Sequence, residues 1–141
     1  VQRMSAGTGV LHSEFNHSQE NGLHFLQIWI ETAQRGIQPS YEQKHFPTAE
    51  RQGQWRLVLS PDGRDGSVSV NQDVSLYASL LSAGDHLTTP PSRYAWLHVV
   101  KGSIEVNGER LTTGDAAAFT PDEHVELTSS DASEVLLFDL A

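Results

Sequence analysis

A histidine and a glutamate stand two residues apart near the start of the chain, in the stretch GVLHSEF from Gly9 to Phe15. On a β-strand, residues i and i+2 point to the same face, so His12 and Glu14 would reach into one shared space. An imidazole nitrogen and a carboxylate oxygen both bind divalent transition metals. The spacing marks His12 and Glu14 as candidate metal ligands, although a single H-x-E taken alone is more often a solvated polar pair.

The sequence offers little other catalytic chemistry. It contains no G-x-S-x-G, P-loop or dinucleotide-binding fingerprint. Ser13 is only the sequence neighbour of His12, and adjacent residues of a strand face opposite ways. The chain has no cysteine, which excludes a disulfide, a thiolate nucleophile and a zinc–cysteine site. That absence is compatible with a reducing cytoplasm, which is where we expect the protein.

Composition narrows the class of partner. The 141 residues correspond to one ordinary domain, and 9 Lys and Arg stand against 18 Asp and Glu, a formal net charge of −9. Phosphate binding needs a basic face, so we expect neither a nucleic-acid partner nor an anionic membrane surface. No run of about 18 apolar residues is present to span a bilayer.

The elements that must position the candidate ligands are strands. Short apolar, β-branched and aromatic runs predict strands at residues 23–30, 74–81, 94–100, 103–106, 109–111, 116–119 and 134–138. In residues 74–81 apolar side chains alternate with others, which predicts one buried face. Residues 41–46 indicate an exposed or edge strand. No convincing amphipathic helix occurs, and the fold class is all-β.

Turn signals support a sandwich or barrel. They recur every eight to twelve residues or so, the spacing typical of such folds. Asn107-Gly108 joins two short runs, and this dipeptide is the strongest local signal for a β-hairpin. Gly102 and Gly114 mark further turns. The stretch PDGRDG at residues 61–66 and the residues 34–40 are predicted as connectors.

Several motifs in the same order resemble the cupin superfamily and, more narrowly, the pirin family. Gly84-Asp85-His86, then Tyr94-Ala95-Trp96, then the run Val100 to Gly108 resemble the first motif of a cupin, and Gly114 to Pro121 the start of the second. Met4 to Gly9 followed by His12-Ser13-Glu14 resembles the end of the metal-binding motif of pirins. Residues 27–30 and 36–44 resemble the stretch between the two pirin domains, and residues 59–67 a loop of bacterial pirins related to quercetin 2,3-dioxygenases.

The resemblance implies a cupin jelly-roll β-barrel and a particular place in it for the early ligand pair. In pirins three histidines and one glutamate hold a single metal, and two of the histidines come from an upstream His-x-His. His12 and Glu14 match the other two ligands, and this sequence has no His-x-His. The resemblance therefore implies the C-terminal part of a two-barrel protein. Residues 1–40 would be the remnant of the first cupin barrel and the connector, and residues 41–141 the second barrel.

The second barrel is expected to carry no metal, as in the family. Its residues offer no His-x-His before Gly102. His86 comes too early in the sequence, and His98 has the apolar neighbours Trp96 and Val100. The position that would match the family's later histidine ligand is occupied by Glu126 and not by His124. His17, His24 and His45 have no partner at ligand spacing.

By resemblance, the full-length parent is a metal-dependent quercetin 2,3-dioxygenase that opens a flavonol ring with O2. Its cofactor would be one divalent transition metal, with iron ahead of nickel, manganese, copper and zinc, and Glu14 would act as the catalytic general base. With two ligands missing, the chain alone is expected to be inactive. The alternatives are a non-catalytic interaction or regulatory module, and a small-molecule-binding barrel. We also expect residues 4–31 either to fold back on the second barrel or to form a homodimer through their exposed strands.

Overall fold

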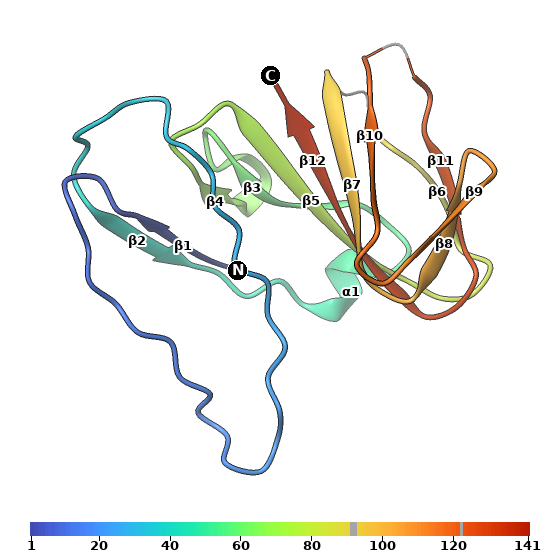
Figure 1. The fold of residues 1–141 in the computed structure, drawn as a ribbon, viewed down its shortest axis with the longest axis horizontal. Coiled ribbons are helices and arrows are strands. Elements are labelled where there is room, and N and C mark those ends of the chain that lie inside the picture. Colours follow the sequence, from blue (N-terminus) through green and yellow to red (C-terminus); the bar gives the residue numbers. More distant parts are fainter. Residues whose placement is uncertain (91–92, 122) are drawn as a thin grey trace.

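Three β-sheets make up the structure, a computed structural model that describes residues 1–90, 93–121 and 123–141. A six-stranded sheet has the order β10-β7-β12-β5-β3-β4, and a four-stranded sheet has the order β6-β11-β8-β9. A separate two-stranded sheet pairs β1 with β2. Figure 1 shows the two larger sheets side by side, with the small sheet and a long blue loop set apart from them. The all-β jelly-roll prediction is confirmed.

The strands have these bounds: β1 Gln2–Ser5, β2 Ser40–Gln43, β3 Arg56–Ser60, β4 Val68–Ser69, β5 Val74–Leu81, β6 His86–Thr88, β7 Tyr94–Lys101, β8 Ser103–Val106, β9 Glu109–Thr112, β10 Ala116–Phe119, β11 Glu126–Ser129 and β12 Ser133–Leu140. Two short helical turns, α1 at Thr48–Arg51 and a 3-10 turn at Arg64–Gly66, lie in connections between strands. All strand pairs are antiparallel except β3 with β4.

The main apolar core lies between the two larger sheets. Its buried members come from strands of both sheets and from the loop before β11, and they are Leu81, Ala95, Leu97, Val99, Ile104, Val106, Val125, Leu127, Val135 and Leu137. Alternation along β12 places Val135 and Leu137 in this core, while Leu136 and Phe138 point to the opposite face. The barrel therefore closes around side chains of its own strands.

A second apolar cluster covers the other face of the six-stranded sheet. Phe46, Val58, Leu59, Val68, Val74, Leu76 and Ala78 are buried there, and Ile30, Leu136 and Phe138 pack against them. As a result β5 is buried on both faces, with Ser75 and Ser79 also buried. The prediction of one buried face for residues 74–81 is wrong, because chain outside the barrel covers the second face.

The turns confirm the sequence-based predictions in the barrel. Asn107 and Gly108 join β8 to β9 with φ values of 49° and 86°, the two positive φ angles that a type I′ hairpin requires. Gly102 separates β7 from β8 at a φ of 87°. A Cβ at that position would lie 2.4 Å from Ser133 Oγ and 2.6 Å from the carbonyl oxygen of Ala132, so only glycine fits.

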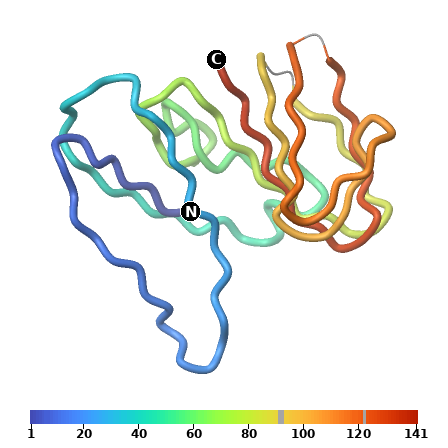
Figure 2. The backbone as a smooth tube through the Cα atoms, in the orientation of Figure 1, coloured from blue at the N-terminus to red at the C-terminus, as the bar shows by residue number. Residues whose placement is uncertain are grey.

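The predicted strand at residues 23–30 is not formed. The segment belongs to no sheet of the structure, and Figure 2 shows it as the lighter blue limb that returns from the tip of the long loop toward the barrel. An apolar, β-branched run becomes a strand only when a neighbour accepts its hydrogen bonds. Its end is tied to the barrel, where the amide of Ala33 donates to the carbonyl oxygen of Asn71 at 2.8 Å.

Within the described ranges of the chain, no helix is long and apolar enough to cross a membrane.

Candidate functional site

The sheet of β1 and β2 presents two chemically different faces. The register pairs Arg3 with Glu42 and Met4 with Tyr41, and directly opposed residues of a ladder share a face. Arg3 and Glu42 therefore lie on one face, together with Ser5 and Ser40, and Gln2, Met4, Tyr41 and Gln43 lie on the other.

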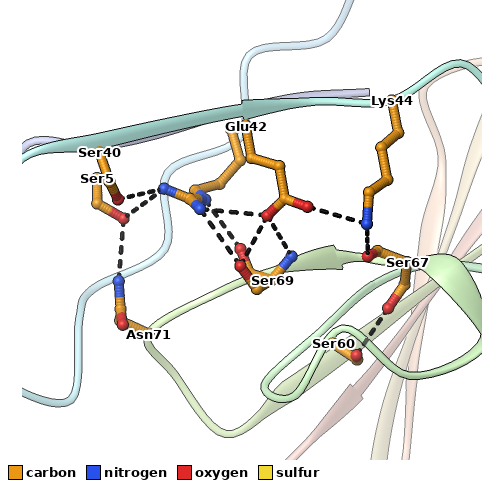
Figure 3. Close-up of polar contacts among 9 residues, drawn as sticks. Ser5, Ser40, Glu42, Lys44, Ser60, Ser67, Ser69 and Asn71 are labelled. Atoms are coloured by element: carbon orange, nitrogen blue, oxygen red, sulfur yellow. Dashed lines mark hydrogen bonds and ion pairs between the residues drawn. The ribbon is translucent and has the colours of Figure 1, made fainter.

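The face that carries Arg3 is fastened to β4, the edge strand of the six-stranded sheet, as Figure 3 shows. We call the residues involved the clasp: Arg3, Ser5, Ser40, Glu42, Lys44, Ser67, Ser69 and Asn71. Arg3 Nε donates to the carbonyl oxygen of Ser69 at 2.8 Å, and the Ser69 amide donates to Glu42 Oε2 at 3.0 Å. Side chains of the small sheet thus satisfy the free backbone groups of an edge residue, in place of a neighbouring strand.

Further polar contacts complete the clasp. Arg3 Nη1 donates to Ser40 Oγ at 2.6 Å, and Arg3 Nη2 lies 3.3 Å from Glu42 Oε2. Lys44 Nζ lies 2.9 Å from Glu42 Oε1 and donates to the carbonyl oxygen of Ser67 at 2.6 Å. The clasp therefore joins β1 and β2 to residues 67–69 by charge-assisted hydrogen bonds.

Glu42 is held ionised by these partners. The hydroxyl and the amide of Ser69 donate to its carboxylate, and Lys44 adds a hydrogen bond and a positive charge. Together they lower the pKa of Glu42 to about 2. The carboxylate of Glu42 is therefore charged at neutral pH.

The opposite face of the small sheet lines an open hollow that contains both candidate ligands. His12 and Glu14 border it together with Gln2, Met4 and Tyr41. Residues 9–15 form no ladder, and Leu11 and Ser13 border the hollow as well as His12 and Glu14, so the pairing of His12 with Glu14 on one face stays a prediction. Gln2 Nε2 donates to Glu14 Oε1 at 3.3 Å, so a residue of β1 contacts the carboxylate directly.

A tight turn fixes where the ligand segment leaves β1. Gly7 has a φ of 53°, and a Cβ there would lie 2.1 Å from the carbonyl oxygen of Ile37. The amide of Thr8 donates to that same oxygen at 3.2 Å, and the amide of Gly9 donates to the carbonyl oxygen of Ala6 at 2.7 Å. Glycine is required at position 7 because the backbone of the connector passes so close.

His12 and Glu14 suit a transition metal by donor type but make up only half of a donor set. Nitrogen and oxygen donors bind iron, nickel, manganese, copper and zinc. Catalytic sites usually have three or more protein ligands. Across residues 1–90, 93–121 and 123–141, no group of three or more His, Cys, Asp or Glu side chains is arranged to hold a metal. Within the described residues the pair alone therefore does not make up a complete metal site.

The other histidines lie elsewhere. His124 Nε2 is 3.1 Å from Glu126 Oε1, and His86 Nε2 is 3.9 Å from Glu126 Oε2, on the exposed face of the four-stranded sheet. His98 is half-buried on β7, opposite Leu136 of β12. His24 and His45 border a separate cavity between the small sheet and the barrel, and His17 lies in the exposed loop.

The sequence reasoning missed the clasp and the contact of Gln2 with Glu14. The signal that was available is the alternation of polar side chains at Arg3 and Ser5 and at Ser40, Glu42 and Lys44, which is typical of two strands that share a polar face. No pattern in the sequence indicates that Ser69, 66 residues away from Arg3, is the partner.

Two opposed, mainly antiparallel sheets around an apolar core are consistent with a jelly roll, and the match of residues 57–140 to a cupin-domain model identifies the barrel as a cupin. The chain belongs to the pirin family. The family model described as the quercetinase C-terminal cupin domain matches residues 57–140, and the model described as pirin matches residues 1–30.

Relatives and solved structures agree with this assignment. The chain is 44% identical over 141 residues to quercetin 2,3-dioxygenase of Escherichia coli K12, a match of 99% of this chain and 60% of the relative. The crystal structure of YhhW from Escherichia coli superposes with a TM-score of 0.72 at 38% identity, over 80% of this chain and 48% of that one. The bacterial pirin YhhW in complex with nickel(II) gives a TM-score of 0.69 at 39% identity, over 77% of this chain and 47% of that one. The chain thus spans about 60% of the length of this curated relative.

Proposed function

We propose that this chain is part of a metal-dependent dioxygenase that acts on a flavonol-like substrate, and that His12 and Glu14 supply two of the metal's ligands. The observation that carries the proposal is the 44% identity to a quercetin 2,3-dioxygenase over the whole chain, ligand segment included. The nickel(II) complex of the YhhW pirin supports a divalent transition metal. Iron is the metal we propose first, and nickel, manganese, copper and zinc accept the same donors.

The bound metal would act as a Lewis acid toward the oxygen atoms of the substrate. Glu14 keeps a carboxylate oxygen available to accept the proton of the flavonol hydroxyl, which makes it the general base. His12 helps to hold the centre at the hollow. Met4 and Tyr41 border the same hollow and offer an apolar and aromatic wall for a planar substrate.

We propose that the chain contributes to two barrels with different roles, with the boundary at about residue 40. Residues 1–40 would contribute to a first barrel that contains the metal, and residues 41–141 would form a second barrel without one. The sheet of β1 and β2 bridges this boundary, since residues 2–5 pair with residues 40–43. The 141-residue chain by itself would then turn over no flavonol.

Replacing Glu14 with Gln in the full-length gene product tests the proposal. We expect flavonol turnover, measured as loss of quercetin absorbance under oxygen, to fall by a factor of about 100 or more, since general-base catalysis contributes that much. Glu20→Gln is the matched control, because Glu20 is an exposed carboxylate of the same segment that does not border the hollow. Equal turnover in the wild type and Glu14→Gln would contradict the assignment.

The exposed apolar side chains of the same segment favour a second candidate role, as an interaction surface. Leu11, Phe15 and Trp29 are 101%, 83% and 88% exposed, whereas Ile30 packs against the barrel cluster. Extended segments with unpaired backbone groups associate with other strands. A homodimer of the 141-residue chain in light scattering, lost when Leu11 and Trp29 are changed to Ser, would support this role, and a monomer would contradict it.

A further inference from the structure

Strand β1 contacts the second barrel through one face of the small sheet and the hollow through the other. β1 alternates between them: Arg3 points to the clasp, and Gln2, its sequence neighbour, donates to Glu14. Adjacent residues of one strand share a rigid backbone, so fixing one side chain limits the position of the other.

The clasp side is well determined. Arg3 has a side chain only 13% exposed and makes hydrogen bonds with Ser69, Ser5, Ser40 and Glu42. A guanidinium held by several acceptors in fixed directions has little freedom to move. These contacts with Ser69, at the edge of the barrel, thereby limit the position and orientation of β1 relative to the barrel. Figure 3 shows the side chains that contact Ser69.

The hollow side is less constrained. Residues 9–15 belong to no ladder, and the hydrogen bond of Gln2 to Glu14, 3.3 Å long, ties their carboxylate to β1. An amide that donates to one carboxylate oxygen orients the carboxylate and leaves the other oxygen available. Hydrogen bonds of this kind orient metal ligands, and removing them commonly weakens metal binding.

We propose that Gln2 is a positioning residue that orients Glu14, and that the clasp holds Gln2 in place from the second barrel. The inference rests on the proposed function, because it assumes that Glu14 is a metal ligand. It gives the metal-free barrel a specific role, because the contacts of Ser69 with Arg3 and Glu42 set the position of the strand that supports the ligand.

Metal affinity tests the first half of the proposal without depending on turnover. Nickel(II) is titrated into the full-length gene product against a chromophoric chelator, and the absorption spectrum of the bound nickel is recorded. Gln2→Met keeps the length of the side chain and removes the donor. We expect it to weaken nickel binding tenfold or more and to shift the nickel spectrum, with the thermal unfolding of the barrel unchanged.

Gln43→Met is the matched control. Gln43 is paired with Gln2 in the register and has the same side chain, but it does not border the hollow. Nickel affinity of Gln43→Met should equal that of the wild type. Equal affinities for the wild type and Gln2→Met would overturn the role of Gln2.

Arg3→Met tests the second part of the proposal, that the clasp holds Gln2 in place, because Arg3 lies on the clasp face of the small sheet. We expect nickel binding to weaken at least threefold while the main core stays folded at the temperature of the titration, because the clasp lies outside that core. Unchanged affinity in Arg3→Met would overturn the role of the clasp.

Glu14→Gln separates this inference from the proposed function. If Glu14→Gln leaves nickel affinity unchanged, then Glu14 is no ligand and the proposed function fails together with the inference. If Glu14→Gln abolishes binding and Gln2→Met does not weaken it, the proposed function stands and the inference alone fails.

Discussion

The barrel of residues 56–140 and the segment of residues 6–33 differ in how their backbone is satisfied. Each described barrel strand is hydrogen-bonded to at least one neighbour, and β12 pairs with β5 along its full length and with β7 from Glu134 to Leu140. The segment has no ladder, and large apolar side chains such as Leu11 and Trp29 stand in solvent. The barrel has a core of its own, and the segment carries the candidate ligands.

The difference separates the part of the chain that has its own core from the part that carries the candidate ligands. A region that buries its own apolar side chains holds its shape without further contacts. The segment is held by the turn at Gly7 and the contact of Ala33 with Asn71 at its ends, by the packing of Ile30 on the barrel and by the hydrogen bond of Gln2 to Glu14. The clasp connects the barrel to β1 and β2, the strands that flank the segment, so its strength limits how firmly the candidate ligands are placed.

Truncating one leucine in each region gives the largest contrast. Leu97 is fully buried in the main core, so we expect Leu97→Ala to lower the free energy of unfolding by about 3 kcal/mol. Leu11→Ala should change it by less than about 0.5 kcal/mol, since Leu11 is fully exposed. Urea denaturation of the two variants measures both values. Similar losses would mean that the segment is part of the cooperative fold.

Gly102 and Gly108 lie at the two ends of β8, and replacing each with alanine separates the cost of a positive φ from the cost of a steric clash. Gly102→Ala should destabilise the barrel by about 2–3 kcal/mol, because the new Cβ meets Ser133 and Ala132 and the φ is positive. Gly108→Ala should cost only about 1 kcal/mol, since it has a similar φ and nothing lies within 4 Å of its Cβ. Thermal unfolding followed by circular dichroism compares the variants. Equal costs would show that φ alone, and not the close contact, makes Gly102 necessary.

Acid should loosen the clasp before the barrel. The pKa of Glu42 is about 2 in the folded protein, below its ordinary value of 4.5, so protonation opposes the folded contact. The stabilisation that Glu42 provides is therefore complete above about pH 4.5 and is lost as the pH falls toward 2.

Hydrogen exchange measures this effect. As the pH is lowered from about 5 to about 2.5, the amides of β1 and β2 should lose protection relative to those of β12, after correction for the intrinsic pH dependence. In Glu42→Gln this extra loss should be absent, because the amide side chain of the variant does not titrate. The same pH dependence in both proteins would assign it to a different group.

The sequence predicts the barrel well and the segment poorly, for a physical reason. The Asn107-Gly108 turn and the strands around it depend on local preferences, so the residues themselves specify them. Residues 23–30 have the composition of a strand, but a ladder also needs a partner, and composition does not supply one.

The candidate site was predictable in part. The i, i+2 spacing and the resemblance to pirins single out His12 and Glu14; both border the hollow, but so do Leu11 and Ser13, and their role as ligands stays a prediction. Gln2 and the clasp depend on pairings between residues far apart in sequence, such as Arg3 with Ser69. Such pairings follow from the register of β1 with β2, which the sequence alone does not specify.

Metal content of the full-length gene product tests the central claim most directly. Elemental analysis by mass spectrometry, after dialysis against metal-free buffer, would compare the wild type with His12→Ala and with His17→Ala, a histidine of the same segment outside the hollow. The account predicts close to one transition-metal ion per chain in the wild type and in His17→Ala, and a loss of most of it in His12→Ala. Equal metal content in all three proteins would contradict the assignment of His12 and Glu14 as ligands.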